Sequence, residues 1–240
     1  MAQQRLDKLL AGTGRWSRRE VKDLIRQGRV AVDGLRAGRP EDKCDPALSV
    51  LTVDGEEADC APFVYLMLHK PAGLLSATED RSQKTVLDLL PEPLRRRGLF
   101  PVGRLDKDTE GLLLLTDDGP LAHGLLSPRK HVDKVYFARV DGLLTREDVR
   151  ALGEGMTLGD GLRCLPADLE ALGDGSECRL TLREGKYHQA KRMLAARGKP
   201  VLYLKRLSMG PLMLDEALER GAWRPLKPEE LRALRQETGA

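Results

Sequence analysis

The sequence contains few aromatic residues, few cysteines and no long hydrophobic run. Phe, Trp and Tyr make up 4% of the 240 residues, so we expect a core built mainly from Leu and Val. The longest apolar runs, at 64–68 and 112–115, are far shorter than the roughly 18 residues of a membrane span. The first residues, MAQQRLDK, contain no apolar segment of the signal-peptide type. These absences predict a cytoplasmic protein without a membrane partner.

The four cysteines form no recognisable pattern. None belongs to a C-x-x-C pair, and no histidine lies at ligand spacing from any of them. Such spacing favours reduced thiols over a disulfide framework or a zinc site. We therefore expect no metal at these positions, which are Cys44, Cys60, Cys164 and Cys178.

Charge is unevenly distributed, although the net charge is only +3. Residues 1–40 hold ten Lys or Arg and four Asp or Glu, whereas residues 41–60 hold one Lys and seven Asp or Glu. A basic segment followed by an acidic one indicates a small module with one face suited to an anion.

Two short helices and a strand are predicted within the first 34 residues. Leucines at helical spacing in QRLDKLLAG predict the first helix. The second begins at Ser17, which forms a capping-box pattern with Glu20, and it ends at Gly28. The segment RVAVDG then predicts a strand that enters an Asp-Gly turn.

The second helix carries a strip of cations beside its apolar face. At helical spacing, four cations fall within an arc of about 100° next to the side that holds its apolar residues. A solvated surface is one interpretation, and a phosphate-binding surface is the other, because further cations lie in the same segment. The cationic strip consists of Arg18, Arg19, Lys22 and Arg26, and the further cations include Arg5, Lys8, Arg15 and Arg29.

Residues 4–34 resemble an S4 RNA-binding domain, a module named for a ribosomal protein family. The resemblance implies that the cationic strip, with Arg5 and Lys8, contacts RNA phosphates. The following acidic segment predicts a closing strand and a linker near 55–62. We therefore expect the S4 domain to occupy residues 1–60.

From residue 63 onward, short strands alternate with a few helices. Apolar or alternating segments predict strands at FVYLMLHK, GLLLLT, VYFARV, CRLTL, VLYLKRL and LMLD. Helices are expected at 121–126, 146–152 and 187–197. Because strands outnumber helices and connections are short, we predict an α+β domain over residues 61–240 with a mostly antiparallel mixed sheet.

The stretch GRLDKDTEGLLLLTDDG, residues 103–119, combines a buried strand with several carboxylates. Asp106 lies in the polar loop before the leucines, where rigid sheets often present chemistry. Asp117 and Asp118 are explained by an ordinary turn. For Asp106, Asp108 and Glu110, the residues alone leave two interpretations: all are solvated, or one is catalytic. Two acids would also suit glycoside hydrolysis.

Four segments resemble motifs of the pseudouridine synthases, in the RsuA-like branch that modifies ribosomal RNA. They occur in the family's order and, with the S4 module, span residues 4–230. The segments are HKPAG, GRLDKDTEGLLLLTDDG, SPRKHVDKVYFARV and REGKYHQAKRM.

The resemblance implies a role for each matching residue. Asp106 corresponds to the catalytic aspartate, Tyr136 to the aromatic that stacks on the target uracil, and Lys191 to the basic partner of the aspartate. Breaking the N1–C1′ bond of uridine and rejoining the base through C5 needs no redox step, so no cofactor or metal is implied. The resemblance also implies RNA contacts from Arg104, His188 and Gln189.

The expected substrate is one uridine of 16S rRNA, either free or in a pre-ribosomal particle. The HQAKRM form favours the small-subunit enzymes, and a 23S site is the alternative. An RNA-binding protein with an inactive synthase domain, and a carbohydrate hydrolase, are the competing classes. The sequence does not reveal the oligomeric state, for which we expect a monomer.

Overall fold

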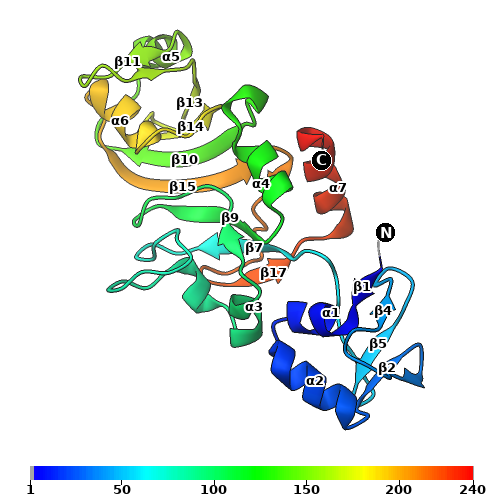
Figure 1. The fold of residues 1–240 in the computed structure, drawn as a ribbon. Helices are drawn as coiled ribbons and strands as arrows, with labels where there is room; N and C mark the ends of the chain where they lie inside the picture. Colours follow the sequence, from blue (N-terminus) through cyan, green and yellow to red (C-terminus); the bar gives the residue numbers. More distant parts are fainter. Residues whose placement is uncertain (1–2, 240) are drawn as a thin grey trace. The chain divides into compact units, whose positions relative to one another are not determined.

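The computed structural model describes residues 3–239, which form two compact units (Figure 1). One unit comprises residues 3–64 together with Leu90–Leu99, and the other comprises Tyr65–Leu89 and residues 100–239. The chain therefore passes from one unit to the other three times. No helix within the described residues is long and apolar enough to cross a membrane.

The N-terminal unit contains two helices and short antiparallel strands. Its four-stranded sheet has the order β3-β2-β5-β6, and β1 pairs with β4. The elements are β1 (Gln4–Arg5), α1 (Leu6–Gly12), α2 (Arg18–Arg26), β2 (Val30–Val32), β3 (Leu35–Arg36), β4 (Lys43–Cys44), β5 (Leu51–Val53) and β6 (Glu56–Glu57).

The local signals of this unit are confirmed. The Ser17 side chain accepts a hydrogen bond from the backbone N–H of Glu20, and the Glu20 carboxylate accepts one from the backbone N–H of Ser17. The turn after β2 places Asp33 and Gly34 at φ of 52° and 79°, as a two-residue hairpin requires. The apolar faces of both helices meet the sheet in one core, which includes Leu10, Val21, Leu24, Ile25, Val30 and Leu51.

Helix α3 (Glu92–Arg96) belongs to the N-terminal unit although it lies far along the chain. Gly14, at φ 76°, packs so closely against α3 that an added Cβ would overlap the carbonyl oxygen of Pro93. The Arg97 guanidinium also donates to the Ala61 carbonyl at 3.0 Å. Nothing in the sequence pattern predicted this return of the chain.

The second unit is built on a mixed sheet whose principal order is β13-β14-β10-β15-β9-β7-β17. Within the described residues, its one parallel pair is β9 with β15. The predicted α+β class with a mostly antiparallel sheet is therefore confirmed. The strands are β7 (Tyr65–Lys70), β8 (Phe100–Pro101), β9 (Glu110–Thr116), β10 (Lys134–Val140), β11 (Met156–Thr157), β12 (Arg163–Cys164), β13 (Asp168–Leu172), β14 (Glu177–Leu182), β15 (Val201–Met209), β16 (Leu212–Met213) and β17 (Trp223–Pro225).

Strand β9 is buried along its whole length, as its run of leucines predicted. Because side chains alternate across a strand, Leu112 and Leu114 share one face, where they join the core beneath α4 (Gly119–Leu126) and α7 (Pro228–Thr238). Asp118 does more than close a turn: its carboxylate accepts from the backbone N–H of Leu121 and caps α4. The remaining helices are α5 (Arg146–Gly153) and α6 (Gln189–Ala196), with short 3-10 turns at Val86–Leu89 and Pro128–Lys130.

Candidate active site

Asp106 lies in the loop that joins β8 to β9, directly before the buried strand. The loop is fixed on both sides of this residue. Ser76 exchanges two hydrogen bonds with the backbone of Leu105, at 2.9 and 3.1 Å, and the Thr109 N–H donates to the Asp106 carbonyl at 3.0 Å. A rigid loop of this kind holds the Asp106 carboxylate in one position.

Lys70, at the end of β7, is the main anchor of this loop. Its side chain is fully buried, and Nζ donates to the carbonyls of Pro71, Lys107 and Thr109 at 3.0, 3.2 and 2.8 Å. Burial lowers the pKa of Lys70 to about 8, against the attraction of nearby carboxylates including Asp106. Lys70 was not among the predicted site residues. Its position in the HKPAG segment could have indicated a role. Its hydrogen-bond acceptors, however, are backbone carbonyls, which cannot be predicted from side-chain patterns.

Gly111 fixes the other end of the loop. It stands opposite Arg206 in the parallel pairing of β9 with β15, and its φ is 107°. A Cβ at this position would overlap the backbone of Arg206. The two strands can therefore approach closely only because residue 111 is glycine.

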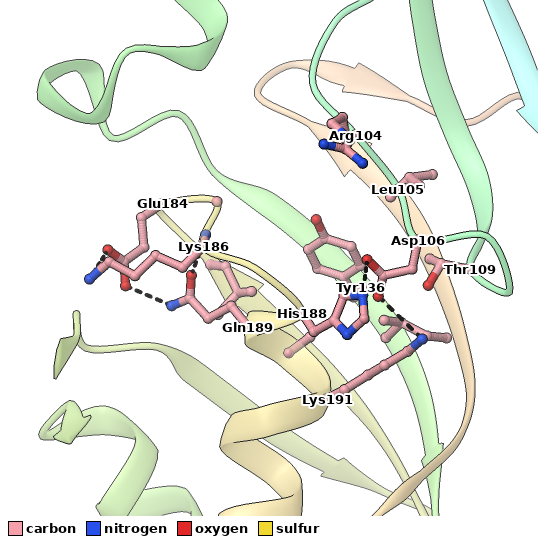
Figure 2. Close-up of a pocket in the computed structure, with 14 residues that line it drawn as sticks. Arg104, Leu105, Asp106, Thr109, Tyr136, Glu184, Lys186, His188, Gln189 and Lys191 are labelled. Atoms are coloured by element: carbon pink, nitrogen blue, oxygen red, sulfur yellow. Dashed lines mark hydrogen bonds and ion pairs between the residues drawn. The ribbon is translucent and has the colours of Figure 1, made fainter. Parts of the chain in front are cut away.

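Two cationic or polar side chains meet the Asp106 carboxylate (Figure 2). Lys191 Nζ lies 3.2 Å from Asp106 Oδ2 and 2.5 Å from Asp108 Oδ1, so it bridges the two acids. His188 Nε2 lies 3.4 Å from Asp106 Oδ1. The two aspartates differ in environment, because the Asp106 side chain is 24% exposed and that of Asp108 is 75% exposed.

The charges of this cluster stabilise one another. Partial burial would lower the pKa of Lys191, but the hydrogen bonds that it donates to Asp108 and Asp106 outweigh that effect and raise the pKa above its usual value. The hydrogen bond from Lys191 lowers the pKa of Asp108. Lys191 therefore remains a cation, and Asp108 a carboxylate, around neutral pH.

Tyr136 contributes the aromatic side of the same pocket. It lies on β10 and lines the pocket together with Leu182 of β14, Leu204 of β15 and residues at the start of α6. The pocket is open to solvent, and the empty space within and in front of it amounts to about 450 Å³. Its lining combines apolar side chains, such as Leu105, Leu182 and Leu204, with polar ones, which is typical of a site that takes a flat, partly polar ligand.

Gln189 has a structural role at the start of α6. Its amide N–H donates to Glu184 at 2.7 Å, while its amide oxygen accepts from the Lys186 backbone N–H at 3.1 Å. Glu184 also accepts from the backbone N–H of Leu165 at 2.8 Å. Gln189 thus braces the turn before α6 even though it lines the pocket.

The pocket unites all the predicted site residues of the second unit: Arg104, Asp106, Tyr136, His188, Gln189 and Lys191. Arg104 stands exposed at its rim. Within residues 3–239, no group of three or more His, Cys, Asp or Glu side chains is arranged to hold a metal ion.

The predicted RNA contacts of the N-terminal unit are all exposed, but they differ in their pairing. Arg5 forms two hydrogen bonds to the buried Asp7 carboxylate, at 3.0 and 2.9 Å, and Arg26 pairs with Asp23 at 2.8 Å. No ion pair is recorded within residues 3–239 for the remaining four, which are Lys8, Arg18, Arg19 and Lys22.

The sequence matches two family models in the order in which these features occur. Residues 4–49 match the S4 domain, and residues 64–196 match RNA pseudouridylate synthase, a match that covers more than half of the chain. The chain belongs to the RNA pseudouridylate synthase family. The second match contains Asp106, Tyr136 and Lys191.

Full-length relatives agree with this membership. A Bacillus subtilis protein named uncharacterized RNA pseudouridine synthase YtzG is 49% identical over 97% of this chain and 98% of its own length. The ribosomal small subunit pseudouridine synthase A of Pseudomonas aeruginosa is 43% identical over 95% and 98%. A crystal structure of a pseudouridylate synthase, 35% identical, superposes with a TM-score of 0.68 over 96% of this synthase and 99% of that chain.

Proposed function

We propose that this synthase isomerises one uridine of small-subunit ribosomal RNA to pseudouridine, with Asp106 as its essential carboxylate. The observation that carries the proposal is the single pocket shared by Asp106, Lys191 and Tyr136, which lie on three separate elements. It supplies a carboxylate, a cation and an aromatic face, which are the groups that the reaction needs.

In the reaction, the N1–C1′ bond breaks, the uracil turns, and C5 bonds to C1′. The proton on C5 is then lost and N1 gains one, so the product is an isomer of the substrate. A carboxylate serves such a sequence as nucleophile or as general base. Both roles require the Asp106 carboxylate to be held in one position, as the Lys70 anchor and the Lys191 bridge favour.

Tyr136 is proposed to stack on the target base. Because a base inside a helix is inaccessible to chemistry, it must leave its stack, and an aromatic face in the pocket compensates for part of that loss. Stacking of one base on an aromatic residue contributes roughly 1–3 kcal/mol. Lys191 is proposed to neutralise the carboxylate cluster, and Arg104 and His188 to contact the RNA at the rim.

The N-terminal unit is proposed to bind RNA through phosphate contacts of Lys8, Arg18, Arg19 and Lys22. In this arrangement residues 1–60 form the RNA-binding domain and residues 61–240 the catalytic domain. The name of the Pseudomonas aeruginosa relative supports the small-subunit target. The enzyme would then work in the cytoplasm, where ribosomal particles are assembled in bacteria, and we propose that it does so as a monomer.

The test compares Asp106→Asn with Asp108→Asn on 16S and 23S transcripts labelled with tritium at C5 of uridine. Wild type should release tritium from the 16S transcript alone. Asp106→Asn should release none while it binds RNA and melts like wild type. Asp108→Asn should stay within about tenfold of wild type, because exposed ion pairs contribute little.

Tritium release from the 23S transcript alone would show that the target uridine lies in 23S and not in 16S rRNA. Turnover by pure Asp106→Asn would remove that residue from its role, and an inactive wild type that still binds RNA would support the RNA-binding alternative.

A further inference from the structure

Tyr187 is an aromatic residue that the proposed chemistry leaves unused. It lies in the turn before α6, one residue from His188, and 74% of it is exposed. It contributes almost nothing to a core in a chain with only nine aromatic residues. A tyrosine ring left in solvent beside a pocket therefore needs another explanation.

The Tyr187 ring is nevertheless held in place. It stacks on the His188 imidazole with ring centroids 3.8 Å apart and planes 18° apart. His188 itself has a left-handed backbone, φ 48°, which is unfavourable for a residue other than glycine. Its Nε2 is directed at Asp106 at 3.4 Å (Figure 2). The Asp106 carboxylate thus meets the edge of the imidazole, and the Tyr187 ring covers one of its faces.

The outer face of the Tyr187 ring is a free stacking surface. Within residues 3–239, the ring contacts recorded for Tyr187 are those with His188, so one face is used. Arg104, which lines the same pocket, is exposed and supplies a cation there, and no ion pair is recorded for it among the described residues. Cations combined with an exposed aromatic face are the usual features of a single-stranded RNA surface.

We infer that the outer face of Tyr187 stacks on the unpaired base next to the target uridine. This inference rests on the proposed function, because extrusion of the target base is what leaves its neighbour without a stacking partner. The ligand is a nucleobase of any identity, since stacking does not distinguish one base from another. Tyr187 thereby positions the RNA strand, and His188 transmits that placement to the carboxylate.

The test starts with the 16S rRNA transcript and the variants Tyr187→Ala, Tyr187→Leu and Tyr187→Phe. Loss of one stack should lower single-turnover kcat/KM about 5- to 150-fold in the Ala and Leu variants, and Tyr187→Phe should stay within about twofold of wild type. All three should melt like wild type because the side chain is exposed. Equal kcat/KM for Tyr187→Ala and wild type would overturn the inference.

The second arm uses short RNAs around the mapped uridine that carry an abasic residue on its 5′ or its 3′ side. One of the two abasic RNAs should lower wild-type kcat/KM by the same factor as Tyr187→Ala, and the combination should lower it no further. If Tyr187→Ala lowers kcat/KM on both abasic RNAs by the same factor as on the intact RNA, Tyr187 acts only through His188. That result would refute the stacking role.

The affinity of the 16S transcript for wild type and Tyr187→Ala, measured in parallel, separates this inference from the proposed function. If wild type forms no pseudouridine but binds RNA more tightly than Tyr187→Ala does, the proposed activity is contradicted and the stacking role of Tyr187 is still supported. Equal affinities in that case would contradict both.

Discussion

Replacing Lys70 by methionine should destabilise the second unit and impair catalysis together. Methionine nearly matches the volume of the lysine stem, so the change removes the three hydrogen bonds of Nζ and leaves little cavity. The carbonyls of Lys107 and Thr109 then lose their partner on both sides of Asp108. Since misplacement of a reacting group by about 1 Å lowers rates about 100-fold, we expect at least that loss in turnover.

The magnitude follows from two opposing terms. A hydrogen bond from a charged donor contributes about 1.5–3 kcal/mol, so three bonds contribute about 4.5–9 kcal/mol. Burial opposes them, since a pKa lowered from 10.5 to about 8 corresponds to a penalty of about 3 kcal/mol for the charged form. Lys70→Met should therefore lower the free energy of unfolding by about 1.5–6 kcal/mol at pH 7.5.

Lys134 offers a matched control within the same sheet. It is also buried, burial lowers its pKa to about 8, and its Nζ donates to one carbonyl, that of Val132, at 2.8 Å. Lys134→Met removes the same cost of about 3 kcal/mol for burying a charge but loses only one hydrogen bond, worth about 1.5–3 kcal/mol. The Lys134→Met variant should therefore be as stable as wild type or up to about 1.5 kcal/mol more stable. The contrast between the two variants isolates the contribution of the loop carbonyls.

Urea unfolding followed by tryptophan fluorescence measures both variants. The chain has two tryptophans, Trp16 in the N-terminal unit and Trp223 on β17, so a Trp16→Phe background reports the second unit alone. Equal effects of Lys70→Met and Lys134→Met would refute the assignment of Lys70 as the anchor of the loop.

The pH dependence provides a second check. Burial places the folded-state pKa of each lysine below its unfolded value of 10.5, so between about pH 8 and pH 10.5 the unfolded chain binds a proton that the folded chain does not. Stability should rise with pH in that window, by about 1.4 kcal/mol per unit for each lysine. Burial raises the pKa of Cys178 to about 11 and acts in the opposite direction, so the difference between wild type and each variant is measured. A difference that does not change between pH 7.5 and pH 9.5 would contradict the lowered pKa values.

Two further predictions concern RNA. Tyr136→Phe should bind the 16S transcript like wild type, whereas Tyr136→Ala should lose about 5- to 150-fold in single-turnover kcat/KM, and a fully active Ala variant would make Tyr136 a core residue only. Combined Arg19→Gln and Lys22→Gln should weaken binding of any RNA and reduce the slope of log K against log salt by about 0.7–0.9 per lost contact. Arg29→Gln is the control, because that guanidinium already binds Asp54 at 2.6 Å, and an unchanged slope in the double variant would leave the strip a solvated surface.

Local signals predicted local structure well. The capping box at Ser17 and Glu20, the Asp-Gly turn after β2 and the fully buried strand β9 are all present where the pattern indicated. Each depends on interactions between residues close together in the chain, or on an apolar run that only a core can accommodate. Helix α7 was missed although Leu231 and Leu234 are at helical spacing after Pro228, which was a usable signal.

Long-range features were outside what a single sequence shows. The motifs named Asp106, Tyr136 and Lys191 one by one, but the bridge from Lys191 to both aspartates depends on packing between residues about 80 positions apart. Gln189 illustrates the same limit, because its expected RNA contact competes with two internal hydrogen bonds. Tyr187 belongs to the segment REGKYHQAKRM, but its exposure is a property of the folded chain that the segment does not reveal.

The path of the chain between its two units restricts how the protein can be divided. Leu90–Leu99 folds with the N-terminal unit, yet it lies between strands β7 and β8 of the second. A fragment beginning at residue 65 would carry this segment without its partner, and would expose Leu90 and Leu99, which are buried in the whole chain. A fragment ending at residue 64 would leave Gly14 without α3 beside it. Neither unit is therefore expected to fold correctly when it is cut out or moved to another protein. A gene fusion or an expression fragment has to keep the two units in one polypeptide.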